Sequence, residues 1–124
     1  MDVISFINQQ MTALGINYQF LEWQGKPPYP YFVGELYENP ILTEDGQKGF
    51  DLTLTGWHRG ESVAPLEADR KKLEKHFDPI YGYRAEVENG AIVIMYENAT
   101  YIPSGEASLK KIEINLTIKT WKGD

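Results

Sequence analysis

Two histidines are the side chains in this sequence best suited to acid–base or metal chemistry near neutral pH. His58 and His76 are eighteen positions apart, and the chain has no cysteine. Neither histidine belongs to a His-x-x-x-His or Glu-x-x-His pair, so we expect no metal site and no cofactor. His58 next to Arg59 could act as a general base, but no serine elbow or spaced acid accompanies it. A polar strand end is the simpler interpretation, and a small hydrolase centred on His58 is kept as an alternative.

Paired carboxylates are the second feature that could do chemistry, because glycoside hydrolysis uses two of them. Glu44-Asp45 lies in a polar turn, and Glu86 and Glu88 alternate on one face of a predicted hairpin. Solvated acids account for both pairs. No glycine-rich stretch has the phosphate-binding spacing between a strand and a helix. We therefore predict that the protein is not an enzyme.

Aromatic residues are more numerous than one small core readily hides. They include Trp23, Tyr29, Tyr31, Phe32, Tyr37, Trp57, Tyr81, Tyr83, Tyr96, Tyr101 and Trp121. Tyrosine and tryptophan favour interfaces. A module that binds a sugar or a peptide through residues 29–37 could present them too, as could ordinary core packing with partial exposure. Trp121 is the residue we single out as an interface anchor.

The element that must organise these residues is the stretch 108–122. Ile112, Ile114, Leu116 and Ile118 fall on even positions, and polar residues fall between them. This period of two predicts a strand with one face toward a core and the other toward water or a partner. Ten or more residues at about 3.3 Å each span roughly 35 Å, so we expect part of the strand to project past its neighbours.

The first half of the chain predicts a helix and three strands. Asp2 can cap a helix whose apolar face is formed by Ile4, Ile7, Met11 and Leu14, with Gly15 as its stop. Strands are expected over 18–23, 31–36 and 50–58, separated by a proline-rich connection and by a mobile loop over 38–47.

The second half predicts a helix and three more strands. Ser62 is expected to cap a helix with an apolar stripe of Val63, Leu66, Leu73 and Phe77. Asn89-Gly90 predicts a hairpin that pairs Val87 with Ile92 and Ala85 with Ile94. Val93 and Met95 then point to the opposite face, which a helix or another subunit must cover. A mobile loop over 97–107 leads into the final strand.

These elements predict a single α+β domain over residues 1–124. The order is helix, three strands, helix, three strands, with the two helices packed on a mostly antiparallel sheet of about five or six strands.

Composition limits the possible partners. Twelve Lys and Arg against eighteen Asp and Glu give a net charge of −6, which argues against autonomous or sequence-specific nucleic-acid binding. Residues 1–69 carry −7 and residues 70–124 carry +1, an asymmetry that suits head-to-tail contact between identical subunits. The apolar runs are too short to cross a bilayer and the start lacks a signal peptide, so we expect cytoplasmic synthesis and no membrane partner.

Several segments together resemble a family of small tail-completion or tail-terminator proteins, which join head to tail in long-tailed phages and prophages of Gram-positive bacteria. The segments are Tyr29-Pro30-Tyr31-Phe32-Val33-Gly34-Glu35, Thr43-Glu44-Asp45-Gly46, Leu54-Thr55-Gly56, Arg59-Gly60, Ile102-Pro103-Ser104-Gly105, Leu109-Lys110-Lys111-Ile112-Glu113-Ile114-Asn115-Leu116 and Thr117-Ile118-Lys119-Thr120-Trp121. The similarity runs through most of the chain. These are strand and turn segments rather than catalytic signatures.

The resemblance implies a structural virion protein, made in the host cytoplasm and located in the tail. Such a protein forms a ring, commonly a hexamer, on the head-proximal end of the tail tube, and it contacts the tail tube protein and the head connector. A ring needs a heterologous contact between identical copies. We expect this contact to use Trp121, Val93 and Met95, with Lys110 and Lys119 guarding an unpaired edge of the final strand.

Overall fold

The computed structural model describes residues 2–39, 47–87 and 90–122. It has two helices, α1 (Val3–Leu14) and α2 (Ala64–His76), and six strands, β1 (Tyr18–Phe20), β2 (Tyr31–Asn39), β3 (Gln47–Arg59), β4 (Tyr83–Val87), β5 (Gly90–Ile102) and β6 (Leu109–Lys122). The predicted α+β class and the order of elements are therefore confirmed. The expected loop over 38–47 is shorter, because β2 reaches Asn39 and β3 begins at Gln47; its remainder lies outside the described residues.

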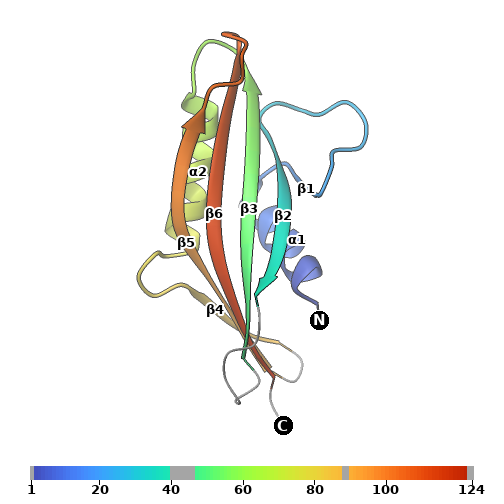
Figure 1. The fold of residues 1–124 in the computed structure, drawn as a ribbon, viewed down its shortest axis with the longest axis vertical. Helices are drawn as coiled ribbons and strands as arrows, with labels where there is room; N and C mark the ends of the chain where they lie inside the picture. Colours follow the sequence, from blue (N-terminus) through green and yellow to red (C-terminus); the bar gives the residue numbers. More distant parts are fainter. Residues whose placement is uncertain (1, 40–46, 88–89, 123–124) are drawn as a thin grey trace.

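All six strands form one curled sheet in the order β1-β2-β3-β6-β5-β4 (Figure 1). The sheet is mixed, because β1 runs parallel to β2 while the other four pairs are antiparallel. The expectation that the final strand projects past its neighbours is wrong. β6 lies in the centre of the sheet, since β3 and β5 are themselves thirteen residues long and pair along it on both sides.

The core lies between one face of this sheet and both helices. The even-numbered residues Ile112, Ile114, Leu116 and Ile118 are each 0% exposed, which confirms the predicted alternation. They belong to the same buried cluster as the apolar residues of α1 and α2. Both helices therefore cover the same sheet face, and we call the opposite face, which they leave uncovered, the outer face.

Helix α1 begins and ends at the predicted residues. The Asp2 carboxylate accepts a hydrogen bond from the Ser5 N–H at 2.7 Å, and Gly15 ends the helix in the left-handed conformation at φ 73°. The buried stripe differs from the prediction, since Phe6, Ile7 and Met11 are buried whereas Ile4 is 38% exposed. The helix is rotated so that the larger Phe6 ring enters the core.

Helix α2 begins one residue later than predicted. Val63 is its N-cap residue and makes no side-chain cap bond, while the Ser62 hydroxyl accepts from the Ala64 N–H at 3.1 Å instead. Leu66 and Leu73 are buried as expected, but Val63 is 37% exposed. Ser62 therefore forms a local turn ahead of the helix rather than capping it.

The β4–β5 hairpin is offset from the predicted register. Val87 lies opposite Gly90 and Ala85 opposite Ile92, two residues from the predicted pairs. The expected loop over 97–107 is shorter than predicted, because β5 continues to Ile102, and the loop runs from there to the start of β6 at Leu109. An irregularity between Tyr96 and Asn98 shifts the register by one residue and allows the strand to continue along β6.

Candidate functional site: the outer face of the sheet

The outer face is polar along its middle. Cross-strand pairing places Thr53 beside Asn115, and Asn115 beside Asn98. The Thr53 hydroxyl donates to Asn115 Oδ1 at 3.0 Å, and Asn115 Nδ2 donates to Asn98 Oδ1 at 2.8 Å. This ladder of side chains crosses β3, β6 and β5. It separates two ends of the outer face that carry larger apolar and aromatic groups.

The first of these we call the Trp121 end. Cross-strand pairing places Ala91 opposite Trp121, and Val93 opposite Lys119, while Met95 lies one step further along β5. The Arg84 guanidinium lies 5.9 Å from the centre of the Trp121 ring, a cation–π contact that helps to orient the indole. The structure therefore brings together Trp121, Val93, Met95 and Lys119, all predicted as interface residues.

Lys110, the remaining predicted interface residue, lies elsewhere. It is opposite His58 at the other end of β6, on the helix side of the sheet, and its ammonium group donates to the Ala107 carbonyl at 2.8 Å. Because β6 is paired on both sides, Lys110 and Lys119 cannot guard an unpaired edge of that strand. That expectation is wrong.

The opposite end of the outer face, which we call the aromatic end, carries a row of rings. Tyr31 stacks on Trp57 at 5.2 Å between ring centres, and Trp23 contacts Tyr31 at 5.2 Å. Tyr29 lies 5.5 Å from Tyr31. The Lys111 ammonium lies 5.9 Å from the Trp57 ring. Sequence reasoning named these aromatics but not the cluster, because only the β2–β3 register places Tyr31 opposite Trp57.

Two cationic groups, Arg59 and Lys111, lie beside the rings of the aromatic end, and Arg59 is paired with a carboxylate. Burial, followed by the nearby Tyr29, raises the pKa of Tyr31 above its ordinary value. Arg59 lies 5.9 Å from the Tyr29 ring and 3.1 Å from the Glu106 carboxylate, and the hydrogen bond to Glu106 raises the pKa of its guanidinium. The end can therefore stack on a flat or apolar ligand and donate hydrogen bonds at its rim.

A polar network on the helix side links α2 to β5. Arg70 bonds to Glu67 at 2.6 Å, and the Tyr101 hydroxyl donates to Glu67 at 2.7 Å. The Arg70 bond and then the Tyr101 bond lower the pKa of Glu67 to about 2. Glu67 therefore stays charged over the whole neutral range. Because the Glu67 carboxylate is already bonded by Arg70 and Tyr101, we assign this network to folding stability rather than to catalysis.

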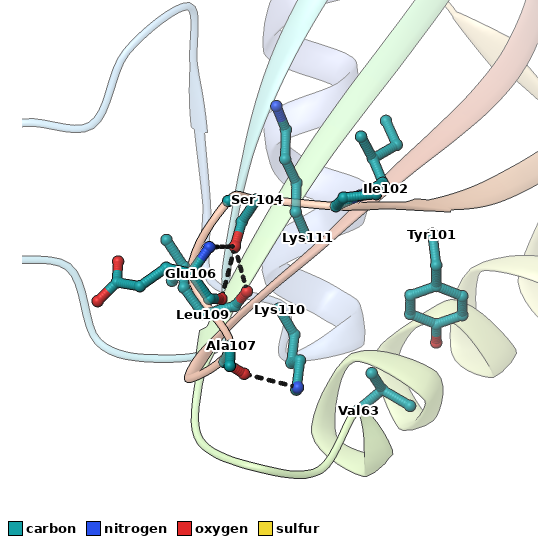
Figure 2. A pocket seen from close by; sticks show the side chains of 11 residues that line it. Val63, Tyr101, Ile102, Ser104, Glu106, Ala107, Leu109, Lys110 and Lys111 are labelled. Carbon is teal, nitrogen blue, oxygen red and sulfur yellow. Dashed lines mark hydrogen bonds between the residues drawn. The ribbon is translucent and has the colours of Figure 1, made fainter.

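A pocket of about 430 Å³ lies between the start of α2 and the β5–β6 hairpin (Figure 2). Val63 and Tyr101 lie on one side of it. On the other side the Ser104 hydroxyl lies 2.6 Å from the Leu109 carbonyl oxygen and accepts from the Glu106 N–H at 3.1 Å. Its lining includes no histidine to activate this serine. The hydroxyl thus holds the hairpin closed.

The histidines do not assemble a catalytic group in the described part of the chain. His58 Nδ1 is buried and has no hydrogen-bond partner among the described residues, so no acid there orients it as a base. His76 Nε2 lies 2.8 Å from Gln10 Oε1, its ring stacks on Tyr83, and burial lowers its pKa. Residues 2–39, 47–87 and 90–122 hold no cluster of His, Asp or Glu able to bind a metal ion.

A search with the sequence finds no matching protein-family model and no matching curated protein. No helix in the described residues is long and apolar enough to span a membrane.

Proposed function

We propose that this protein is a structural tail component of a phage or prophage. It forms a ring on the head-proximal end of the tail tube, ends tail assembly there and provides the surface to which the head connector binds. The proposal takes its biological setting from the resemblance of the strand and turn segments to tail-terminator proteins. Within the ring, the Trp121 end contacts a neighbouring molecule.

The observation that supports this proposal best is the uncovered outer face. Both helices pack on the other side of the sheet, so Trp121, Val93 and Met95 are left at one end without a helix over them. Partly exposed apolar groups beside an oriented tryptophan are typical of an assembly surface. Such a surface suits contact with a neighbouring virion protein, and the ring itself needs a heterologous contact between copies.

The test adds purified protein to unterminated tail tubes and images the tubes by electron microscopy. Wild-type protein should cap the tubes and restore head joining, whereas Trp121→Ala should cap them poorly. Trp23→Ala, which changes a tryptophan at the opposite end of the same face, is the matched control and should behave as wild type. If wild-type protein neither caps nor restores joining, the proposal is wrong. If Trp121→Ala caps normally, only the role of the Trp121 end is wrong.

The aromatic end favours a second candidate function, a module that binds a sugar or peptide. Tyr29, Tyr31, Trp23 and Trp57 form a continuous set of rings, and such platforms stack on the apolar faces of sugars and prolines. Titration with oligosaccharides and proline-rich peptides should then quench tryptophan emission, and Trp57→Ala should remove the response. An unchanged emission spectrum across both ligand classes would reject this function.

A further inference from the structure

We propose that copies of this chain join edge to edge, with β5 of one copy adding to β2 of the next to continue the sheet. This inference deepens the proposed function, because it names the contact that would build the ring. It does not depend on the tail as the partner.

Both strands have an open edge. On the side away from β6, β4 covers β5 only from Gly90 to Ile94, and the Tyr96 N–H donates to the Phe77 carbonyl at 2.8 Å. No described strand pairs with the segment Asn98–Ile102 on that side. On β2, the strand β1 covers Phe32–Gly34, and no described strand covers the segment from Glu35 to Asn39. In each segment alternate residues direct their N–H and C=O groups away from the sheet.

The two open segments match in length and direction. Each is five residues long. Three antiparallel pairings connect β2 to β5 through β3 and β6, so β2 and β5 run in opposite directions. In a closed ring whose strands are tilted to the rotation axis, as they are in barrels, β5 of one copy therefore meets β2 of the next as an antiparallel pair. Antiparallel addition is a favourable and common way to extend a sheet.

The register needed for full overlap also suits a closed ring. Within one chain, Asn98 is level with Glu35, because cross-strand pairs link Asn98 to Asn115, Asn115 to Thr53 and Thr53 to Glu35. Placing Asn98 opposite Asn39 of the next copy requires a displacement from Glu35 to Asn39, or about 13 Å at 3.3 Å per residue. Spread over the strands β2, β3, β6 and β5, this is about one residue per strand. The same stagger accompanies a strand tilt of about 36° in closed barrels.

Side chains on the open segments complement each other in this register. Thr100 meets Tyr37 on the outer face, and Tyr101 meets Leu36 on the helix side. Tyr37 is 72% exposed and Tyr101 is 41% exposed in the single chain, and pairing would cover both. Aromatic residues opposite β-branched or aliphatic ones stabilise antiparallel pairs. Neither segment contains a lysine or a proline, two of the residues that proteins use to block such edges, and the only charges are those of Glu35 and Glu38 on the β2 segment.

Cysteine cross-linking tests this register directly, because the chain has no cysteine of its own. The double variant Tyr37→Cys/Thr100→Cys puts the two sulfurs within disulfide reach only between copies. A second pair, Glu35→Cys/Ile102→Cys, tests the same register at other positions. The control is Tyr37→Cys/Ala68→Cys, because Ala68 is exposed on helix α2 and belongs to neither open segment, so it does not pair with Tyr37 in this register. Each variant is oxidised at rising protein concentration and on tail tubes, then run on a non-reducing gel.

The two edge pairs should give a ladder of linked oligomers several-fold stronger than the control. A ladder no stronger than the control, in solution and on capped tubes, overturns edge pairing. The proposed tail function is tested separately, by imaging the capping of tail tubes by electron microscopy. Capped tubes without the ladder leave the tail function standing and reject the edge contact, whereas a ladder without capped tubes supports the edge contact and rejects the tail function. If neither linked oligomers nor capped tubes form, both the edge contact and the tail function are rejected.

Discussion

At the residue scale, burial separates alternate side chains of β6 into two kinds. Leu116 is 0% exposed in the core, whereas its neighbour Thr117 lies on the outer face opposite Met95. The Leu116 side chain therefore stabilises the fold through packing in the core, whereas the Thr117 side chain lies on the other side of the sheet from that core.

We predict that Leu116→Ala lowers the free energy of unfolding by about 2–5 kcal/mol, because it removes buried methyl groups and leaves a cavity. Thr117→Ala should cost well under about 1 kcal/mol, since it lies outside the core. Chemical denaturation of both variants measures the difference. Equal midpoints would contradict the assignment of the two faces.

The second prediction at the residue scale concerns Glu67 and the loss of folding stability at low pH. Its pKa falls from an ordinary 4.5 to about 2 in the folded chain, so the folded state binds its proton less readily than the unfolded state. The stability it contributes is therefore present above about pH 4.5 and is lost as the pH falls toward 2. Glu67→Gln should flatten the loss of stability in this window.

The measurement is the denaturation midpoint of wild type and Glu67→Gln across that pH range. Glu61→Gln changes an exposed glutamate outside the network and serves as the control. A wild-type acid profile retained by Glu67→Gln would show that the Arg70 and Tyr101 contacts do not hold the charge.

At the element scale, glycine allows β2 and β3 to pack closely. Gly56 lies opposite Phe32, and a Cβ at Gly56 would come within 2.3 Å of the Phe32 ring. Phe32 is itself 0% exposed, so its ring has little room to move. The buried ring therefore occupies the space above a residue that has no side chain.

We predict that Gly56→Ala destabilises the protein by about 1–3 kcal/mol through overpacking. Gly49→Ala, in the same strand, is the matched control, because its Cβ would meet Asn39 at an ordinary 3.7 Å. Thermal melts of the two variants provide the comparison. If Gly56→Ala melts no lower than Gly49→Ala, the Phe32 ring must relax freely.

At the scale of the whole molecule, charge is uneven along the chain. The first 69 residues carry −7 while the rest carry +1, and Lys119 and Arg84 stand at the Trp121 end. Complementary charge brings subunits together faster and is screened by salt.

We therefore predict that ring assembly weakens as ionic strength rises. The fraction of capped tubes, counted by electron microscopy over a salt series, measures this. Lys119→Gln should reduce capping at low salt and lessen the salt dependence, since it removes a charge next to Trp121. Capping that is equally efficient at low and high salt would show that apolar and backbone contacts alone drive assembly.

The sequence by itself determined the two helices, the number of strands and the core face of β6. Alternation with a period of two specifies which side chains are buried, and the Asp2 and Gly15 caps of α1 act through local hydrogen bonds and backbone conformation. It also placed Val93 and Met95 on the face opposite Ile92 and Ile94, but it left open whether a helix covers that face; the structure puts both helices on the other side.

Only the tertiary structure decided which strands are neighbours. Any strand can pair with any other through the same backbone groups, so a local pattern cannot place β6 in the centre or leave the edges of β2 and β5 open. The same reason applies to Tyr31 and Trp57, which are distant in sequence and meet through the β2–β3 register. The continuation of β5 to Ile102 likewise depends on pairing with β6, which overrides the turn-rich composition of residues 97–107.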